Sequence, residues 1–151
     1  MDDGGDFPLA PRRGETKLTR VNPGTSSFDR LGGAQALRAI IAEFVDRLMH
    51  DPMIGFYFRN TSAQRLTDKE YEHAAAALGA PIVYSGRPIS STHRPLKIPG
   101  GHFDRRLQIL RNLMTERGVP GDIQAQWLAE QQSLRRQVTA DPPGECRPGV
   151  E

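Results

Sequence analysis

Cysteine is almost absent from this sequence. The single cysteine, Cys146, has no partner for an intrachain disulfide and no second thiol for a zinc site. An excess of one charge is lacking too, because 20 Lys and Arg residues oppose 18 Asp and Glu residues. The basic residues are scattered along the chain, which argues against the basic stripe of a nucleic-acid-binding protein.

Long apolar runs are also missing. No stretch approaches the length that spans a bilayer, and the first residues, Met-Asp-Asp-Gly-Gly-Asp, do not resemble a secretory signal. We therefore expect a cytoplasmic protein with no membrane partner, present as a monomer or weak dimer.

Both ends of the chain are rich in Gly, Pro and polar residues. We expect residues 1–26 to form a disordered N-terminal arm and residues 141–151 to form a flexible C-terminal tail. The remainder, residues 27–140, is long enough to bury a core and is expected to form one globular domain.

Between the tails, apolar residues recur at helical spacing. One stripe runs with intervals of three and four through Leu37, Ile40, Ile41, Phe44, Val45 and Leu48. A short helix over 28–31 is expected before it. Further helices are expected over about 63–78, 100–118 and 120–138. No stretch alternates with period two over the length of a strand, so the sequence predicts an all-α fold.

A proline-rich segment carries the first candidate ligand, His93. Prolines at 88, 95 and 99 prevent a long helix there, so at most a short turn from Ile89 to Arg94 is expected. A neutral imidazole on such a rigid segment is suited to binding a metal centre if an apolar pocket surrounds it. The alternative is an ordinary surface histidine in a loop.

An aromatic cluster follows the second predicted helix. The segment 53–58, Met-Ile-Gly-Phe-Tyr-Phe, is too short for a normal helix and suits a tight helical turn against a large flat partner. An ordinary corner of the core is the alternative interpretation.

Several local motifs occur in a recognisable order. They are Leu31-Gly32-Gly33, Leu78-Gly79-Ala80-Pro81, Tyr84-Ser85-Gly86-Arg87-Pro88, His93, His102-Phe103 and Gly118-Val119-Pro120. In this order and spacing they resemble the truncated haemoglobins, most closely those of group I, from about Phe28 to Val138. The resemblance implies a two-over-two helical globin that holds haem b between its helix pairs.

The resemblance also implies roles for individual residues. His93, rather than His102, corresponds to the proximal ligand of the haem iron. Arg94 and Lys97 are candidates for contacting the haem propionates, with solvated surface charges as the alternative. The remaining predicted cofactor-binding residues form the apolar slot: Phe44, Val45, Phe58, Leu66, Phe103 and Leu107.

The distal side departs from the family pattern. Val45 and Glu70 occupy positions where relatives that hold oxygen tightly carry a tyrosine and a glutamine. A Glu70 kept neutral by burial could donate a hydrogen bond to a ligand, whereas an ionised Glu70 would turn toward solvent or a cation. Lys69 stands where some relatives place a second iron ligand; a solvent lysine or a propionate partner is the alternative. Three hydroxyl side chains are candidate substitute donors: Tyr57, Tyr71 and Thr67.

The resemblance implies a haem protein that binds oxygen, NO or CO, for oxygen binding or transport. Whether the protein is an enzyme stays open at this point: it could oxidise NO to nitrate with electrons from a reductase. Peroxidase-like or redox haem chemistry is one alternative, and a haem-free helical interaction module is another.

Overall fold

The computed structural model describes residues 25–140. The predicted C-terminal tail, and the predicted N-terminal arm apart from residues 25 and 26, lie outside this range. The helical elements are α1 (Ser27–Leu31), α2 (Gly33–His50), η1 (Gly55–Phe58), α3 (Ala63–Ala77), α4 (Ile89–His93), η2 (Arg94–Leu96), α5 (Gly100–Glu116), α6 (Gly121–Ser133) and α7 (Arg135–Val138). The described residues contain no strand beyond an isolated bridge between Ile98 and Thr139, so the predicted all-α fold is confirmed.

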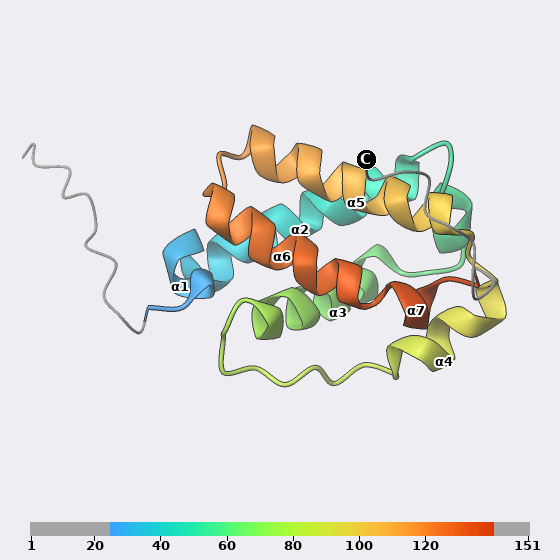
Figure 1. Ribbon diagram of the computed structural model, residues 1–151, viewed down its shortest axis with the longest axis horizontal. Helices are drawn as coiled ribbons and strands as arrows, with labels where there is room; N and C mark the ends of the chain where they lie inside the picture. Colours follow the sequence, from blue (N-terminus) through green and yellow to red (C-terminus); the bar gives the residue numbers. More distant parts are fainter. Residues whose placement is uncertain (1–24, 141–151) are drawn as a thin grey trace, which may run out of the picture.

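Two antiparallel helix pairs form the body of the molecule. Helix α2 packs along α3, and α5 packs along α6, while α2 and α5 also contact each other (Figure 1). A long connection after α3 returns along the lower edge to α4, which lies beside α7. Within residues 25–140, no helix is both long and apolar enough to cross a membrane.

The turn between α1 and α2 depends on Gly32. Its φ of +112° lies in the left-handed region, and its N–H caps α1 by donating to the carbonyls of Phe28 and Asp29. A Cβ at this position would come within 2.9 Å of the Ala36 side chain. Only glycine meets both requirements, which explains the early end of α1.

The stripe predicted on α2 is the centre of the core. Each of its six residues is buried, and Leu37, Ile41 and Leu48 are completely so. Helix α3 presents Tyr71, Ala74 and Ala75 to this core. Leu66 lies half-buried against this core, and Leu78, the residue that caps α3, is completely buried.

The predicted single helix over 120–138 is wrong in detail. The chain breaks at Leu134, whose N–H bonds to the carbonyl of Gln131, three residues back, in place of the usual four. Helix α6 therefore ends at Ser133, and α7 continues in a new direction. The N–H of Ala140 then donates to the carbonyl of Ile98 at 3.0 Å, which fixes the end of α7 beside the segment that follows α4.

Candidate haem site

His93 occupies the last position of α4. Pro88 precedes this helix, and the Nδ1 atom of His93 lies 2.7 Å from the carbonyl oxygen of Ile89. Because a carbonyl only accepts, Nδ1 carries the proton and donates it, which leaves the lone pair on Nε2. The side chain is half-buried. An imidazole oriented in this way has the tautomer that a metal ion requires.

His102 is placed differently. Its Nδ1 atom lies 2.8 Å from the Tyr57 hydroxyl, and its ring stands edge-on to the rings of Phe56 and Tyr57. A phenol can donate or accept, so this contact does not fix the tautomer of His102, whereas the carbonyl of Ile89 fixes that of His93. Burial raises the pKa of Tyr57, so the phenol keeps its proton at neutral pH. This contrast supports His93 over His102 as the ligand.

The predicted slot residues fall into two groups. Phe44 and Val45 are buried in the main core cluster, and Phe58 and Leu66 lie half-buried against it. Phe103 is buried outside this cluster, with the Arg135 guanidinium 5.4 Å from its ring centroid. Leu107, one turn after Phe103 on α5 and also outside this cluster, lines a groove between α5 and α6.

Glu70 is paired with an arginine that the sequence analysis did not single out. Nη2 of Arg106, on α5, donates to both carboxylate oxygens of Glu70, at 2.8 and 2.7 Å. Nη1 of Arg106 donates to Oε1 of Gln131, and its Cζ lies 4.9 Å from the Phe44 ring centroid. The carboxylate has thus met a cation inside the fold. The sequence did contain a signal, because Arg106 falls between Phe103 and Leu110 on the apolar stripe of its helix.

Two of the three candidate hydroxyl donors are bonded elsewhere. Tyr57 is bonded to His102, and Thr67 donates back to the carbonyl of Ala63 at 2.7 Å. The ring of Tyr71 is buried in the core, with the guanidinium of Arg38 4.0 Å from its centroid. Neither Tyr57 nor Thr67 is therefore free to replace the missing phenol at Val45.

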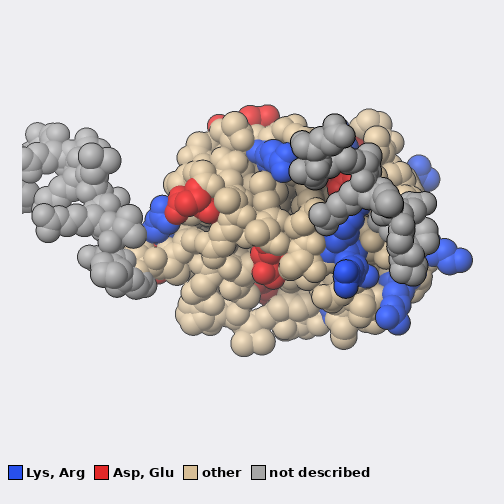
Figure 2. Space-filling model, viewed as in Figure 1, with Lys and Arg blue, Asp and Glu red and all other residues tan. Residues whose placement is uncertain are grey.

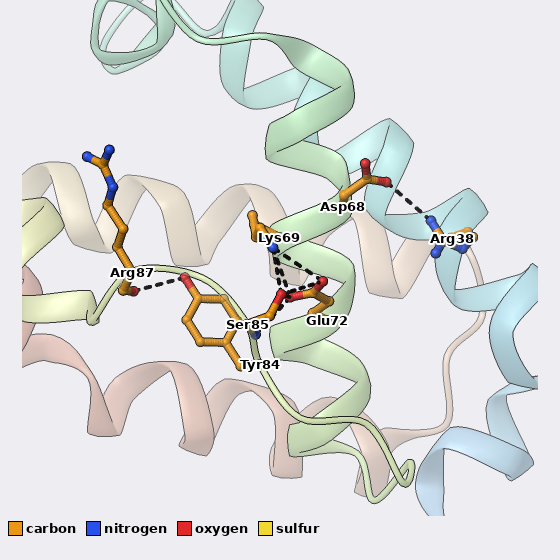
Figure 3. A network of polar contacts seen from close by, with 7 residues as sticks. All are labelled: Arg38, Asp68, Lys69, Glu72, Tyr84, Ser85 and Arg87. Carbon is orange, nitrogen blue, oxygen red and sulfur yellow. Dashed lines mark hydrogen bonds and ion pairs between the residues drawn. The ribbon is translucent and has the colours of Figure 1, made fainter.

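Lys69 takes part in a polar network that fixes the connection after α3. Its Nζ contacts both oxygens of Glu72 at 3.3 Å and donates to Oγ of Ser85 at 2.8 Å (Figure 3). The N–H and hydroxyl of Ser85 also donate to Glu72. These bonds, with that of the backbone N–H first, lower the pKa of Glu72. We refer to Lys69, Glu72 and Ser85 as the loop latch.

Tyr84 reinforces the same connection. Its ring meets the His73 ring edge-on at 5.5 Å, and its hydroxyl donates to the carbonyl of Arg87. Burial, and then the nearby charges of Glu70 and Glu72, raise the pKa of this phenol. The connection between α3 and α4 is therefore held against α3 near its middle, which helps to position His93.

The candidate propionate partners Arg94 and Lys97 are exposed, directly after His93. Figure 2 shows Lys and Arg side chains gathered toward the end of the molecule where α4 and α7 lie. No contact of Arg94 or Lys97 side chains to an acidic partner occurs among the ion pairs of residues 25–140. Both cations are thus available to an external carboxylate.

Comparison with known proteins places these features in context. The profile of the bacterial-like globin family matches residues 26–140. The group 1 truncated hemoglobin GlbN of Mycolicibacterium paratuberculosis is 35% identical over 97 residues, which cover 64% of this chain and 71% of the relative. A group 1 truncated hemoglobin of Tetrahymena thermophila is 27% identical over 96 residues, covering 64% and 79%.

Solved structures agree with the fold. The Fe(III) form of truncated hemoglobin from Tetrahymena pyriformis superimposes with a TM-score of 0.72 at 21% identity, covering 78% of this chain and all of that one. The 2/2 hemoglobin of Synechococcus sp. PCC 7002 gives 0.69 at 22% identity, covering 76% and 98%.

Two antiparallel helix pairs, and the likeness to solved truncated hemoglobins, define a two-over-two globin fold. The chain belongs to the bacterial-like globin family, and within it to the truncated haemoglobins of group 1. It is accordingly a haem-binding, ligand-binding protein.

Proposed function

We propose that residues 27–140 form a haem-binding domain in which Nε2 of His93 ligates the iron of haem b. The observation that carries this proposal is the bond between Nδ1 of His93 and the carbonyl of Ile89, which leaves Nε2 as the lone-pair nitrogen. Haem, when bound, supplies an iron centre that takes up oxygen, NO or CO.

The protein's own side chains would control access to that centre. Phe44, Val45, Phe58 and Leu66 supply apolar surface that excludes water from the haem face. The exposed cations Arg94 and Lys97 would pair with the propionates at the rim. A charge-assisted bond of this kind fixes the porphyrin in its orientation.

Absorption spectroscopy tests the proposal. Purified protein reconstituted with haemin should show a Soret band that shifts or disappears in His93→Ala. His102→Ala is the matched control, and it should keep the wild-type ferric and ferrous spectra. A wild-type protein that stays colourless and takes up no haemin would overturn the proposal and favour a haem-free interaction module.

The reaction proposed for this site is oxidation of NO to nitrate by bound oxygen, with electrons returned by a reductase. The cations gathered near α4 and α7 support an acidic docking face on that reductase. Stoichiometric nitrate formation from NO by the oxygenated protein is the expected result. Release of oxygen with no nitrate would limit the function to ligand binding.

Peroxide turnover is a second candidate. The observation favouring it is the charged pair of Glu70 and Arg106, with Glu70 at the position where oxygen-holding relatives carry a glutamine. A carboxylate beside a guanidinium can accept and return protons of a peroxide. Peroxide consumption that falls in Glu70→Ala, with haem content unchanged, would support this candidate.

A further inference from the structure

Arg106 projects from α5 toward the interior of the fold. It follows Phe103 by three residues and precedes Leu110 by four, and these two are 3% and 0% exposed. Its neighbour Arg105 points the other way and pairs with Asp51 at the end of α2. Of these two neighbouring cations on α5, Arg105 faces the end of α2, and Arg106 faces the interior of the fold.

Side chains from three other helices hold the Arg106 guanidinium. Glu70 on α3 accepts two bonds from Nη2, Gln131 on α6 accepts one from Nη1, and Phe44 on α2 lies beneath Cζ. Gln131 is itself buried, at 4% exposure. A charge fixed in this way needs no reorganisation when a ligand arrives, and so it is preorganised.

Two N–H groups of the Arg106 guanidinium have no acceptor within residues 25–140. Of its five N–H groups, two are used on Glu70 and one on Gln131, which leaves Nε–H and one N–H of Nη1 without a partner among residues 25–140. The Arg106 and Glu70 side chains are 19% and 21% exposed, so small solutes can reach the pair. Free donors on an accessible, anchored cation are suited to binding an anion.

The position of the pair relates it to the haem site. Glu70 lies one helical turn after Leu66 on α3, and Phe44 belongs to the apolar wall. A purely structural ion pair would gain most from sealing itself from water and using all of its donors, because unpaired buried donors are costly. Arg106 is neither sealed from water nor bonded through all of its donors.

We propose that Arg106 is the anion-recognition residue on the distal side of the haem, with Glu70 and Gln131 as its positioning residues. This inference rests on the proposed haem site at His93. It makes the distal side selective for small anions over neutral ligands. Glu70 reduces this selectivity, because its carboxylate partly neutralises the Arg106 guanidinium that an entering anion would contact.

Ligand titration of the ferric haem-loaded protein tests the proposal, with fluoride and azide as anionic probes and CO on the ferrous protein as the neutral one. Arg106→Met should lower fluoride affinity at least tenfold, roughly 1.4 kcal/mol, and change CO affinity less than threefold. Arg106→Lys should recover part of the fluoride affinity. Glu70→Gln should raise it, because the guanidinium charge is then uncompensated.

Arg111→Met is the matched control, since it removes an exposed arginine of the same helix from the groove between α5 and α6. It should leave all three affinities unchanged.

Arg106→Met protein that binds haem and fluoride like the wild type would overturn the inference while leaving the proposed function intact. If Arg106→Met fails to fold, Glu70→Gln decides: raised fluoride affinity supports the inference, and unchanged affinity overturns it. A wild type without a Soret band would refute the proposed function and this inference together.

Discussion

The Nδ1 atom of His93 and the carbonyl oxygen of Ile89 lie 2.7 Å apart, one turn from each other on α4. His93 is the last residue of α4, and its imidazole folds back onto the first turn of that helix. Orientation of the candidate ligand is therefore a local property of this short helix. The surrounding helices decide only what the free Nε2 faces.

Replacing His93 by glycine and adding imidazole should restore the axial ligand. We expect His93→Gly to lose the wild-type Soret band after haem loading and to regain it in millimolar imidazole, because the small ligand can occupy the vacated space. His102→Gly should need no imidazole. The spectrum of the ferric protein against imidazole concentration checks this, and a His93→Gly protein with the wild-type spectrum in buffer alone would refute His93 as the ligand.

The buried Asp51 makes acid stability depend on one ion pair. Bonds from Arg105, and then from the backbone N–H groups of Met53 and Ile54, lower the pKa of Asp51 in the folded protein. Since the pKa is higher in the unfolded chain, about 3.9, this pair stabilises the fold above that pH. The stabilisation is lost as the pH falls through the depressed folded-state pKa.

Asp51→Asn should therefore lower the free energy of unfolding at pH 7 by about 1–3 kcal/mol. The difference from wild type should shrink toward zero in strong acid. Urea unfolding from pH 7 to pH 2 measures both quantities, with the exposed Asp46→Asn as control. A difference that stays constant over the whole pH range would show that the charge of Asp51 is not responsible.

Removing the Glu72 side chain from the loop latch should make the connection between α3 and α4 more mobile. The Ser85 N–H donates to Glu72 at 3.0 Å, so Glu72→Ala should speed hydrogen exchange at this amide severalfold. Asp68→Ala is the control on the same helix, because within residues 25–140 the Asp68 side chain bonds only to Arg38 and Gln64. Equal exchange rates in wild type and Glu72→Ala would mean that the latch does not hold the connection.

We expect the latch to keep Lys69 from binding the iron as a second ligand. In this structure its Nζ is engaged by Glu72 and Ser85. Haem-loaded Glu72→Ala should show a larger six-coordinate low-spin fraction at alkaline pH, and the added change Lys69→Met should abolish it. An unaltered spin state in Glu72→Ala would argue that Lys69 does not reach the iron.

Gly55 should tolerate no side chain. A Cβ there would lie 2.7 Å from the carbonyl oxygen of Met49, a backbone atom that cannot move aside cheaply. Gly55→Ala should cost about 1–3 kcal/mol of stability and shift η1, which carries Phe58. Gly101→Ala, where a Cβ meets nothing within 4 Å, should be neutral or stabilising. Thermal unfolding of the two variants makes the comparison, and equal melting temperatures would contradict it.

Features that depend on residues close together in the sequence were predicted correctly, and features that depend on distant residues were not. Helix limits set by Gly32 and Pro88, and the core stripe on α2, depend on residues within a turn or two of each other. The sequence alone was therefore sufficient for them. The break after Ser133 was missed, because no proline or glycine marks it and the chain beyond it is held by the distant carbonyl of Ile98.

Sequence alone determined the helical class, the family and the short, proline-bounded segment that carries His93. Only the tertiary structure decided which groups neutralise the charges: Glu70 meets Arg106 from 36 positions further along the chain. Periodicity reports how one helix divides its surface between core and solvent. It carries no information on which side chain of another helix will stand opposite, because that depends on the crossing of the helices in space.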